Sequence, residues 1–435
     1  MWDLIVAGSG MAGVGAAISA SKNGCKTLLV EKLSFLGGTA TASLVTPMMK
    51  NMLSNGESLN TPLFDELTYR LRKSGNGGTH ENLNSGWFNP EIMKYVLDDM
   101  CEEAGVEILF DSIVSDVTVS ENKITSIEVV NKAGKQFYNA KYFIDATGDA
   151  DLAAFAGVEY VRGNENGINQ AVSLRFMMSG VDIEALAKWI KHIDPSDHVS
   201  PVCRDENGNI LLTTAYTSED KDWKLKPIFE LGLKEKIIKP EDVEYFQIFS
   251  VPGQKSTIAF NCPRISSKKE LNTLNPQDLS YAYIMGRKQI LRIAEFCKKY
   301  FIGFEDAFIS EIAPLIGVRE SRRIVGKYTL TEKDIVSAKK FKNSVAKSNY
   351  PVDIHSQEKN KSVLEMLPEN DYYEIPLDCL LPKNIDNLLV VGRCISATFR
   401  AQASLRIQPT CLAMGENAGI HISQLLNKSE KLLKG

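Results

Sequence analysis

Short apolar runs and a segment of helical periodicity alternate at the start of the chain. Residues 3–7 (DLIVA) form a mainly apolar run of strand length, and residues 27–30 (TLLV) form a second one. Between them, small side chains recur at helical spacing until Gly24, where a helix C-cap is expected. The pattern therefore predicts strand, helix and strand in direct succession, as in a parallel α/β sheet.

The next part of the chain adds a helix and a run of alternating residues. Residues 90–104 predict an amphipathic helix, and residues 106–110 (VEILF) predict a strand. Residues 113–145 alternate between polar and apolar positions, with turn signals near residues 121 and 133, and predict a β-meander.

From residue 161 the pattern becomes a mixture of strands and helices with no internal repeat. The expected strands span residues 173–179, 244–251 and 256–261, and the expected helices span residues 182–193, 279–300 and 310–325. The basic stretch 327–347 is expected to be a solvated helix surface rather than a nucleic-acid contact. Residues 387–391 predict another buried strand, and an apolar helix is expected from Pro409 onward.

The junction between the first strand and helix carries the strongest chemical signal. Gly8, Gly10 and Gly13 form GxGxxG, and the second strand ends at Glu31. Gly8 permits a tight turn, Gly10 lets backbone approach a pyrophosphate, and Gly13 lets the helix pack against the strand. The helix N-terminus favours phosphate charge, and Glu31 can accept hydrogen bonds from a ribose diol. This combination predicts dinucleotide binding, and the acid disfavours NADP.

Further glycine-containing turns favour FAD over NAD. A second Gly-Gly turn precedes Thr39, a strand ends in Ala-Thr-Gly at residue 148, and another strand ends at Gly392. The helix that begins near Gln408 would direct its N-terminus at the flavin and stabilise negative charge on its pyrimidine edge. The predicted cofactor-binding residues are Gly8, Ser9, Gly10, Met11, Ala12, Gly13, Glu31, Lys32, Gly38, Thr39, Val114, Thr147, Gly148, Gly392, Arg393 and Gln408.

With these motifs the chain resembles the FAD-dependent oxidoreductases among the glutathione-reductase-like (GR2-type) flavoproteins. The resemblance rests on residues 8–13 with Glu31, and on residues 37–39, 88–108, 144–153, 316–334, 350–355, 387–398 and 404–419. It departs from the family at Phe399, where a histidine is common, and at Glu416, where the last helix usually has glutamine.

The resemblance implies an α/β fold with a Rossmann-like FAD-binding domain and an inserted α+β substrate or cap domain. The expected boundaries are residues 1–160 and 385–435 for the FAD-binding domain and 161–384 for the insertion. FAD is expected to be noncovalent, with Cys394 as the residue that would carry a covalent link.

The implied function is hydride transfer between a small organic substrate and flavin N5. One alternative is an FAD-containing binding or RNA-modifying protein of the same superfamily. An NAD-dependent dehydrogenase without flavin is the least supported alternative. The second half-reaction needs an electron acceptor or donor, for which oxygen, a quinone and an electron-carrier protein are the candidates.

The candidate catalytic residues are His355, Arg319, Arg322 and Arg400. His355 lies in the Asp-Ile-His block and could serve as an acid or base, as a substrate contact, or as a structural histidine. Arg319 and Arg322 offer forked donors for an anionic substrate, or they form an Arg–Glu network that joins the two domains. Arg393, Arg400 and Arg406 flank the expected flavin edge.

Composition and charge limit the classes of partner and the location that we expect for the protein. Among 435 residues, 50 Lys and Arg stand against 54 Asp and Glu, a net charge of −4, so no global basic field gathers nucleic acid. No apolar run reaches the ~20 residues that span a bilayer, no signal peptide is evident, and the eight cysteines form no CxxC pair. We therefore expect a cytoplasmic protein with no metal site, no nucleic-acid partner and no membrane span.

Overall fold

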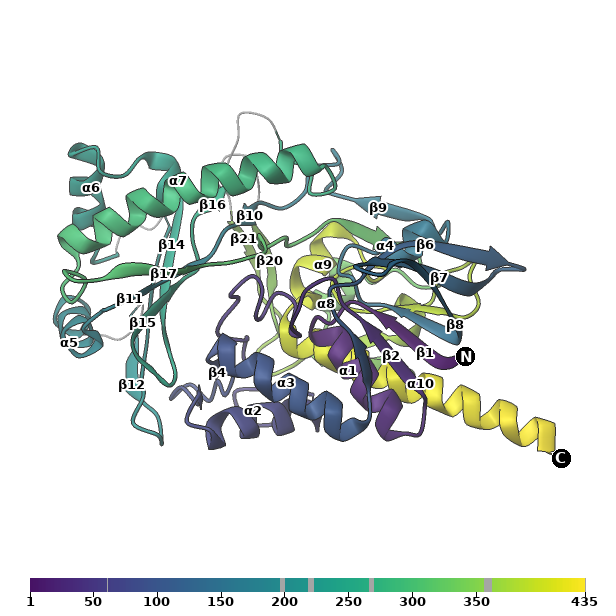
Figure 1. The fold of residues 1–435 in the computed structure, drawn as a ribbon. Coiled ribbons are helices and arrows are strands. Elements are labelled where there is room, and N and C mark those ends of the chain that lie inside the picture. The colour runs from purple at the N-terminus through teal and green to yellow at the C-terminus, as the bar shows by residue number, and fades with distance from the viewer. Residues whose placement is uncertain (61, 196–199, 218–222, 266–269, 356–361, 435) are drawn as a thin grey trace.

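A computed structural model places the chain in two halves, each built on a β-sheet with helices beside it (Figure 1). It describes residues 1–435 except 61, 196–199, 218–222, 266–269, 356–361 and 435. Buried apolar side chains form a core on each face of the first sheet, with Leu4 and Val6 in one and Ile5 and Ala7 in the other. A further large core is drawn mostly from residues 172–316 and belongs to the second sheet.

The first sheet is parallel at its centre. Parallel pairing joins β5 (Glu107–Leu109), β2 (Thr27–Val30), β1 (Trp2–Ala7), β8 (Gly134–Asp145) and β23 (Leu388–Val390) in that order. β1 and β2 are almost wholly buried, as the continuous apolar runs predicted. The strand order brings the carboxyl ends of β1, β2, β8 and β23 to one edge, where ligands bind in such sheets.

The predicted meander is present beside this parallel centre. The antiparallel strands β6 (Ile113–Ser120) and β7 (Lys123–Asn131) join the amino-terminal part of β8. The turn between β6 and β7 places Glu121 and Asn122 at positive φ, and Gly134 begins β8 after the second turn, as the turn signals indicated. β8 thus belongs to both the meander and the parallel centre.

Helices cover one face of the first sheet. α1 (Met11–Lys22) packs along α10 (Gln408–Lys434) because Gly15, Gly415 and Gly419 allow close backbone approach: a Cβ at Gly415 would lie 1.8 Å from the oxygen of Ala12. Figure 1 shows α10 running beside α1 and continuing beyond the sheet. The other helices around this sheet are α2 (Leu63–Lys73), α3 (Pro90–Ala104), α4 (Asp151–Phe155), α8 (Glu332–Val336) and α9 (Phe399–Leu405).

The second sheet is antiparallel. Its order is β12 (Val202–Arg204), β13 (Ile210–Thr217), β14 (Tyr245–Val251), β15 (Gln254–Phe260), β11 (Phe176–Ser179) and β17 (Phe308–Ile312). α5 (Ile183–Ile193), α6 (Lys226–Lys234) and α7 (Pro276–Tyr300) accompany it, and α7 spans the length of this half (Figure 1). The strands and helices expected near residues 176, 183, 245, 256 and 279 are therefore confirmed.

Short two-stranded pairs complete the described strands. They are β3 (Gly77–Gly78) with β4 (Trp87–Phe88), β9 (Tyr160–Arg162) with β18 (Arg322–Ile324), β10 (Val172–Ser173) with β16 (Arg264–Ile265), β19 (Ser344–Ser348) with β22 (Tyr373–Pro376), and β20 (Val352–His355) with β21 (Ser362–Glu365). Leu330, Val352 and Tyr373 pack into the core of the first sheet although they follow the second sheet in sequence.

The helix expected over residues 310–325 is wrong. That segment instead forms β17 and β18, with an irregular stretch between them. β17 pairs with β11 and β18 with β9, so strand pairing that is distant in sequence overrides a local helical pattern. The helix expected over residues 327–347 is also wrong in extent, because only Glu332–Val336 is helical there and β19 begins at Ser344.

Candidate functional site

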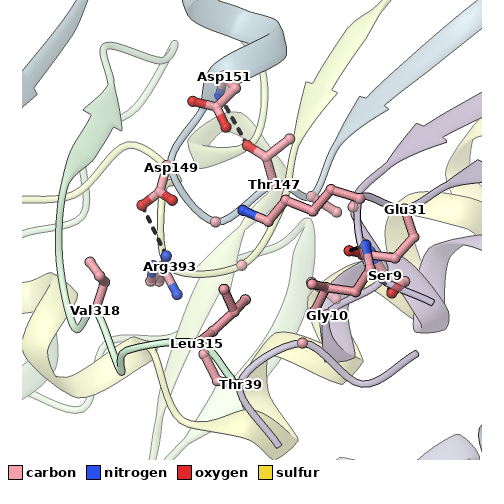
Figure 2. A pocket seen from close by; sticks show the side chains of 18 of the residues that line it. Ser9, Gly10, Glu31, Thr39, Thr147, Asp149, Asp151, Leu315, Val318 and Arg393 are labelled. Carbon is pink, nitrogen blue, oxygen red and sulfur yellow. Dashed lines mark hydrogen bonds and ion pairs between the residues drawn. The ribbon is translucent and has the colours of Figure 1, made fainter. Parts of the chain in front are cut away.

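A pocket opens at the carboxyl edge of the parallel strands (Figure 2). The residues directly after β1, β2, β8 and β23 line it, namely 8–12, 31–33, 146–149 and 391–393. The opposite wall comes from α7 through Leu279 and Tyr283, and from Leu315, Ile316 and Val318. One pocket therefore joins the loops of the parallel sheet to the half that contains the second sheet.

The glycine loop has the geometry of a phosphate cradle. A Cβ at Gly13 would lie 1.9 Å from the oxygen of Gly8, so Gly13 permits the tight passage from strand to helix. A Cβ at Gly10 would meet no atom within 4 Å, because Gly10 faces the open pocket. Space in front of Gly10 at the start of α1 is what a pyrophosphate on a helix N-terminus requires.

The second glycine turn docks directly on the first. The amide of Gly37 donates to the oxygen of Ser9 over 2.9 Å, and Gly10 and Gly37 form a β-bridge. Gly38 has a φ of +54°, and a Cβ there would lie 2.7 Å from the Cα of Gly10. Thr39 follows on the pocket wall (Figure 2), so the two turns form one continuous surface.

Glu31 is buried beside the glycine loop. Its Oε2 accepts from the amide of Ser9 over 2.7 Å and from the Ser9 hydroxyl over 2.6 Å, and its Oε1 accepts from the amide of Leu33 over 2.9 Å. A carboxylate has about four acceptor positions, so these bonds hold the side chain and leave capacity for a ribose hydroxyl.

Hydrogen bonds to Asp145, the last residue of β8, hold the loop that follows this strand. Asp145 is fully buried and accepts from the amide and hydroxyl of Thr147 through Oδ1 and from the amide of Ala153 through Oδ2. Burial raises the pKa of Asp145 to about 6 despite these bonds. Asp145 thereby fixes the turn that presents Thr147 and Gly148 to the pocket.

Arg393 faces Asp149 inside the pocket (Figure 2). Its Nη2 lies 2.9 Å from Oδ1 of Asp149, which also accepts from the Ser321 hydroxyl over 2.5 Å. Burial would raise the pKa of Asp149, but the charge of Arg393 and these hydrogen bonds lower it below its ordinary value. The cation predicted from sequence at Arg393 therefore already has an anionic partner.

The start of α10 supplies the last wall. Gln408 donates through Nε2 to the oxygen of Val45 over 2.7 Å, while its buried Oε1 has no hydrogen-bond partner among the described residues. An orphaned acceptor at a helix N-terminus on the pocket wall fits a ligand that carries an N–H, as the pyrimidine edge of a flavin does.

All predicted cofactor residues except Gly13 line this pocket, including Val114 and Lys32. Gly13 lies behind the loop, against Gly8. Cys394, the candidate for a covalent link, is fully buried and donates to the oxygen of Val391, whereas Cys411 lines the pocket. Sequence reasoning did not single out Asp149, although it lies in the 144–153 block, and it missed the apolar wall around Leu315.

The candidate catalytic residues lie outside the pocket lining. Arg322 pairs with Asp151 over 2.8 Å and donates to the oxygen of Asp149, and Arg400 pairs with Glu365. The neighbouring Arg323 forms a buried ion pair with Glu320 and donates to the oxygens of Ala397 and Gly163. Because these partners come from distant segments, Arg322 and Arg323 join several parts of the chain.

Arg319 and His355 lie in a second group of charged residues. The guanidinium of Arg264 lies 2.5 Å from Nδ1 of His355, and Nε2 of His355 lies 3.1 Å from Oδ2 of Asp353. Burial and the charge of Arg319 lower the pKa of His355 to about 3, so the ring is neutral. A neutral ring between a donor and a carboxylate accepts at Nδ1 and donates from Nε2.

This group reaches the pocket through Arg406. Arg406 lines the pocket, donates to the oxygen of Asp353 over 3.3 Å, and lies 4.0 Å from Oδ2 of the same residue. Tyr350 donates to that carboxylate over 2.8 Å. We call Arg175, Arg319 and Arg406, with Asp353, the arginine cluster. The sequence singled out Arg319 and Arg406 but gave no signal for Arg175.

No group of three or more His, Cys, Asp or Glu residues suited to a metal occurs in the described ranges. Within the same residues, no helix is both long enough and apolar enough to cross a bilayer.

Comparisons with known proteins point to one family. A family model described as FAD-dependent oxidoreductase matches residues 3–433. A digeranylgeranylglycerophospholipid reductase of Methanococcoides burtonii is 27% identical over 192 residues, 42% of this chain and 46% of that protein. A thiamine thiazole synthase of Sulfolobus acidocaldarius is 31% identical over 166 residues, 35% of this chain and 58% of that protein. The chain thus spans about half the length of each of these curated relatives.

Solved structures of similar topology have low sequence identity. A geranylgeranyl bacteriochlorophyll reductase-like protein of Thermoplasma acidophilum has a TM-score of 0.47 and 14% identity, covering 100% of this chain and 83% of that one. A myxobacterial chondrochloren halogenase, described as an FAD-dependent halogenase variant, has a TM-score of 0.48 and 12% identity, covering 98% and 75%.

Proposed function

This chain belongs to the FAD-dependent oxidoreductase family, and from that premise we propose that it transfers a hydride between a small organic substrate and N5 of noncovalently bound FAD. The observation that carries the proposal is the single pocket shared by the glycine loop, Glu31 and the start of α10. FAD, when bound, supplies the two-electron chemistry, and the protein supplies position and charge.

Different parts of the pocket would hold different parts of FAD. The amides around Gly10 and the start of α1 would hold the pyrophosphate, and Glu31 would accept from the ribose. Gln408 would accept an N–H at the other end through its unpartnered Oε1. Leu315, Ile316 and Val318 would exclude water beside the reacting carbon, which strengthens every charge interaction there.

The contacts of the candidate catalytic residues support a catalytic role to different degrees. Among these candidates, Arg319 lies beside the pocket. The preceding residue, Val318, lines the pocket, and so does Arg406, whose charge acts on Arg319. Acid–base catalysis by His355 stays a prediction, and its two occupied ring nitrogens favour a role in holding Arg264 and Asp353. Catalytic roles for Arg322 and Arg400 also stay predictions.

An absorption spectrum of the purified protein tests the proposal. We expect flavin bands that move to the supernatant after acid precipitation, and bleaching of those bands by a substrate under anaerobic conditions. Bands that stay with the pellet would contradict noncovalent binding and direct attention to Cys411, which lines the pocket, before Cys394. The absence of bands after FAD is added would contradict the proposed function.

A further inference from the structure

The arginine cluster holds more positive charge than its described surroundings neutralise. Arg175 donates through Nη1 to the oxygens of Leu44 and Thr46, both over 3.3 Å, and Arg319 donates through Nη1 to the oxygen of Ala171 over 2.6 Å and to the Ser173 hydroxyl over 3.0 Å. Neither arginine forms an ion pair with any carboxylate in the described ranges. Asp353 is the acid that faces the cluster, and it is shared among Arg406, His355 and Tyr350.

The cluster also has guanidinium N–H donors that bond to no described residue. Arg319 makes its side-chain hydrogen bonds through Nη1, and its Nε and Nη2 bond to no described residue. The buried Nε of Arg406 has no partner among the described residues. The Nε and Nη2 atoms of a guanidinium form a fork that matches the two oxygens of a carboxylate.

The electrostatics agree with this geometry. Burial lowers the pKa of Arg319 well below its ordinary value, and the neighbouring charges of Arg264, Arg406 and Arg175 lower it further. Burial likewise lowers the pKa of Arg175 to about 10, with a contribution from Arg406. Several cations brought together away from water are costly unless an anion joins them.

Partial accessibility distinguishes the cluster from a sealed structural network. The side chains of Arg406 and Asp353 keep 17% and 16% of their surface exposed, whereas those of the neighbouring Arg323 and Glu320 keep 4% and 0%. The Arg323–Glu320 pair is neutralised internally. Among the residues that the structure describes, the arginine cluster is not neutralised, and it borders the pocket at Arg406.

We propose that the arginine cluster binds the carboxylate of a small organic substrate whose carbon skeleton lies against Leu315 and Val318 in the pocket. The inference rests on the proposed function, because it places the substrate beside bound FAD. Asp353 limits the site to a single negative charge, since it would repel a phosphate monoester, which carries about −1.5 to −2 at neutral pH, more strongly than a carboxylate. His355 is then a positioning residue that orients Arg264 and Asp353.

The first experiment titrates the FAD-loaded full chain with the monocarboxylates butyrate and propionate, with butyramide as the neutral match. The visible absorption of the bound flavin and the midpoint of thermal unfolding are both followed. We expect both carboxylates to shift the flavin bands and to raise the unfolding midpoint through ligand linkage, and butyramide to do neither. Equal binding of butyramide, or tighter binding of inorganic phosphate than of either carboxylate, would overturn the proposal.

Variants of Arg319 and of Asp353 should change the carboxylate Kd in opposite directions. Arg319→Gln should raise the carboxylate Kd about tenfold or more, because a hydrogen-bonded charge is lost, and Arg319→Lys should fall between it and the wild type. Asp353→Asn should lower the Kd about threefold or more, because a like charge is removed. A purely structural role predicts weaker binding for every one of these variants.

Arg204→Gln is the matched control. Arg204 lies on β12, is 56% exposed and pairs with Glu184, far from the pocket lining. An unchanged Kd in Arg319→Gln and Arg319→Lys, or a raised Kd in Asp353→Asn, would overturn the inference while bound flavin left the proposed function standing. A chain that takes up no FAD would instead overturn the proposed function and, with it, this inference.

Discussion

The guanidinium of Arg393 lies 2.9 Å from the carboxylate of Asp149 on the wall of the pocket (Figure 2). The two residues follow the adjacent parallel strands β23 and β8, so the sheet itself brings them together. Here the cation of Arg393 meets the acid supplied by the loop after β8.

Arg393→Met should show how much this ion pair contributes to the stability of the protein. We expect a loss of about 2 kcal/mol in unfolding free energy at pH 7, below the ~3–5 kcal/mol of a fully buried pair, because both side chains keep part of their surface exposed. Chemical denaturation of the FAD-free protein measures this loss, and a double-mutant cycle with Asp149→Asn isolates the pair.

The pH dependence of the same variant has a defined sign. The depressed pKa of Asp149 contributes stability that is present above the unfolded pKa of ~3.9 and is lost as the pH falls through the folded pKa. Without Arg393, burial raises that pKa and reverses the contribution. The destabilisation by Arg393→Met should therefore be larger at pH 7 than at pH 4, and an equal loss at both would contradict the pairing.

Gly10→Val should impair flavin binding, whereas Gly13→Ala should impair the stability of the fold. A Cβ at Gly10 meets open space, so Gly10→Val should fold with the unfolding midpoint of the FAD-free wild type and lose bound flavin. A Cβ at Gly13 collides with the oxygen of Gly8, so Gly13→Ala should destabilise the FAD-free protein itself. Flavin content and thermal unfolding separate the two, and full flavin occupancy in Gly10→Val would exclude the phosphate cradle.

Glu416 on α10 should make stability fall as the pH rises. Burial raises the pKa of Glu416 to about 7, above the ~4.3 of an unfolded glutamate, so the folded state holds an extra proton between these values. Glu416→Gln, which installs the residue common in the resembling family, should stabilise the protein by about 1–3 kcal/mol at pH 8 and by little at pH 4. Unfolding curves at both pH values check this expectation, and equal effects would refute it.

His355 should contribute no ionisation between pH 5 and 8, because its pKa is lowered to about 3. If it orients Arg264 and Asp353, His355→Gln should keep most of the flavin reduction rate and raise KM more than it lowers kcat. If it transfers protons, His355→Ala and His355→Gln should both slow flavin reduction about 100-fold or more. Stopped-flow reduction by a carboxylate substrate at several pH values distinguishes these roles.

Local signals in the sequence were sufficient for the strand–helix–strand unit at the start of the chain. Gly8, Gly10 and Glu31 are close in sequence, and their places on the pocket wall follow from this one unit, whose apolar runs and glycines are readable without tertiary information. The same holds for the meander, whose turn signals and alternation are local. The helices α5 and α7 were equally predictable from their periodicity.

Tertiary structure decided the rest, because contacts between distant segments leave no periodic signal. The two ends of residues 310–325 form strands through pairing with β11 and β9, against their local helical pattern. Arg319, Arg322 and Arg323 lie within five positions, yet their side chains engage the arginine cluster, Asp151 and Glu320 respectively. The sequence determined which residues could carry charge at the site, and only the packing of segments remote in the chain decided which of those charges meet an acidic partner among the described residues and which do not.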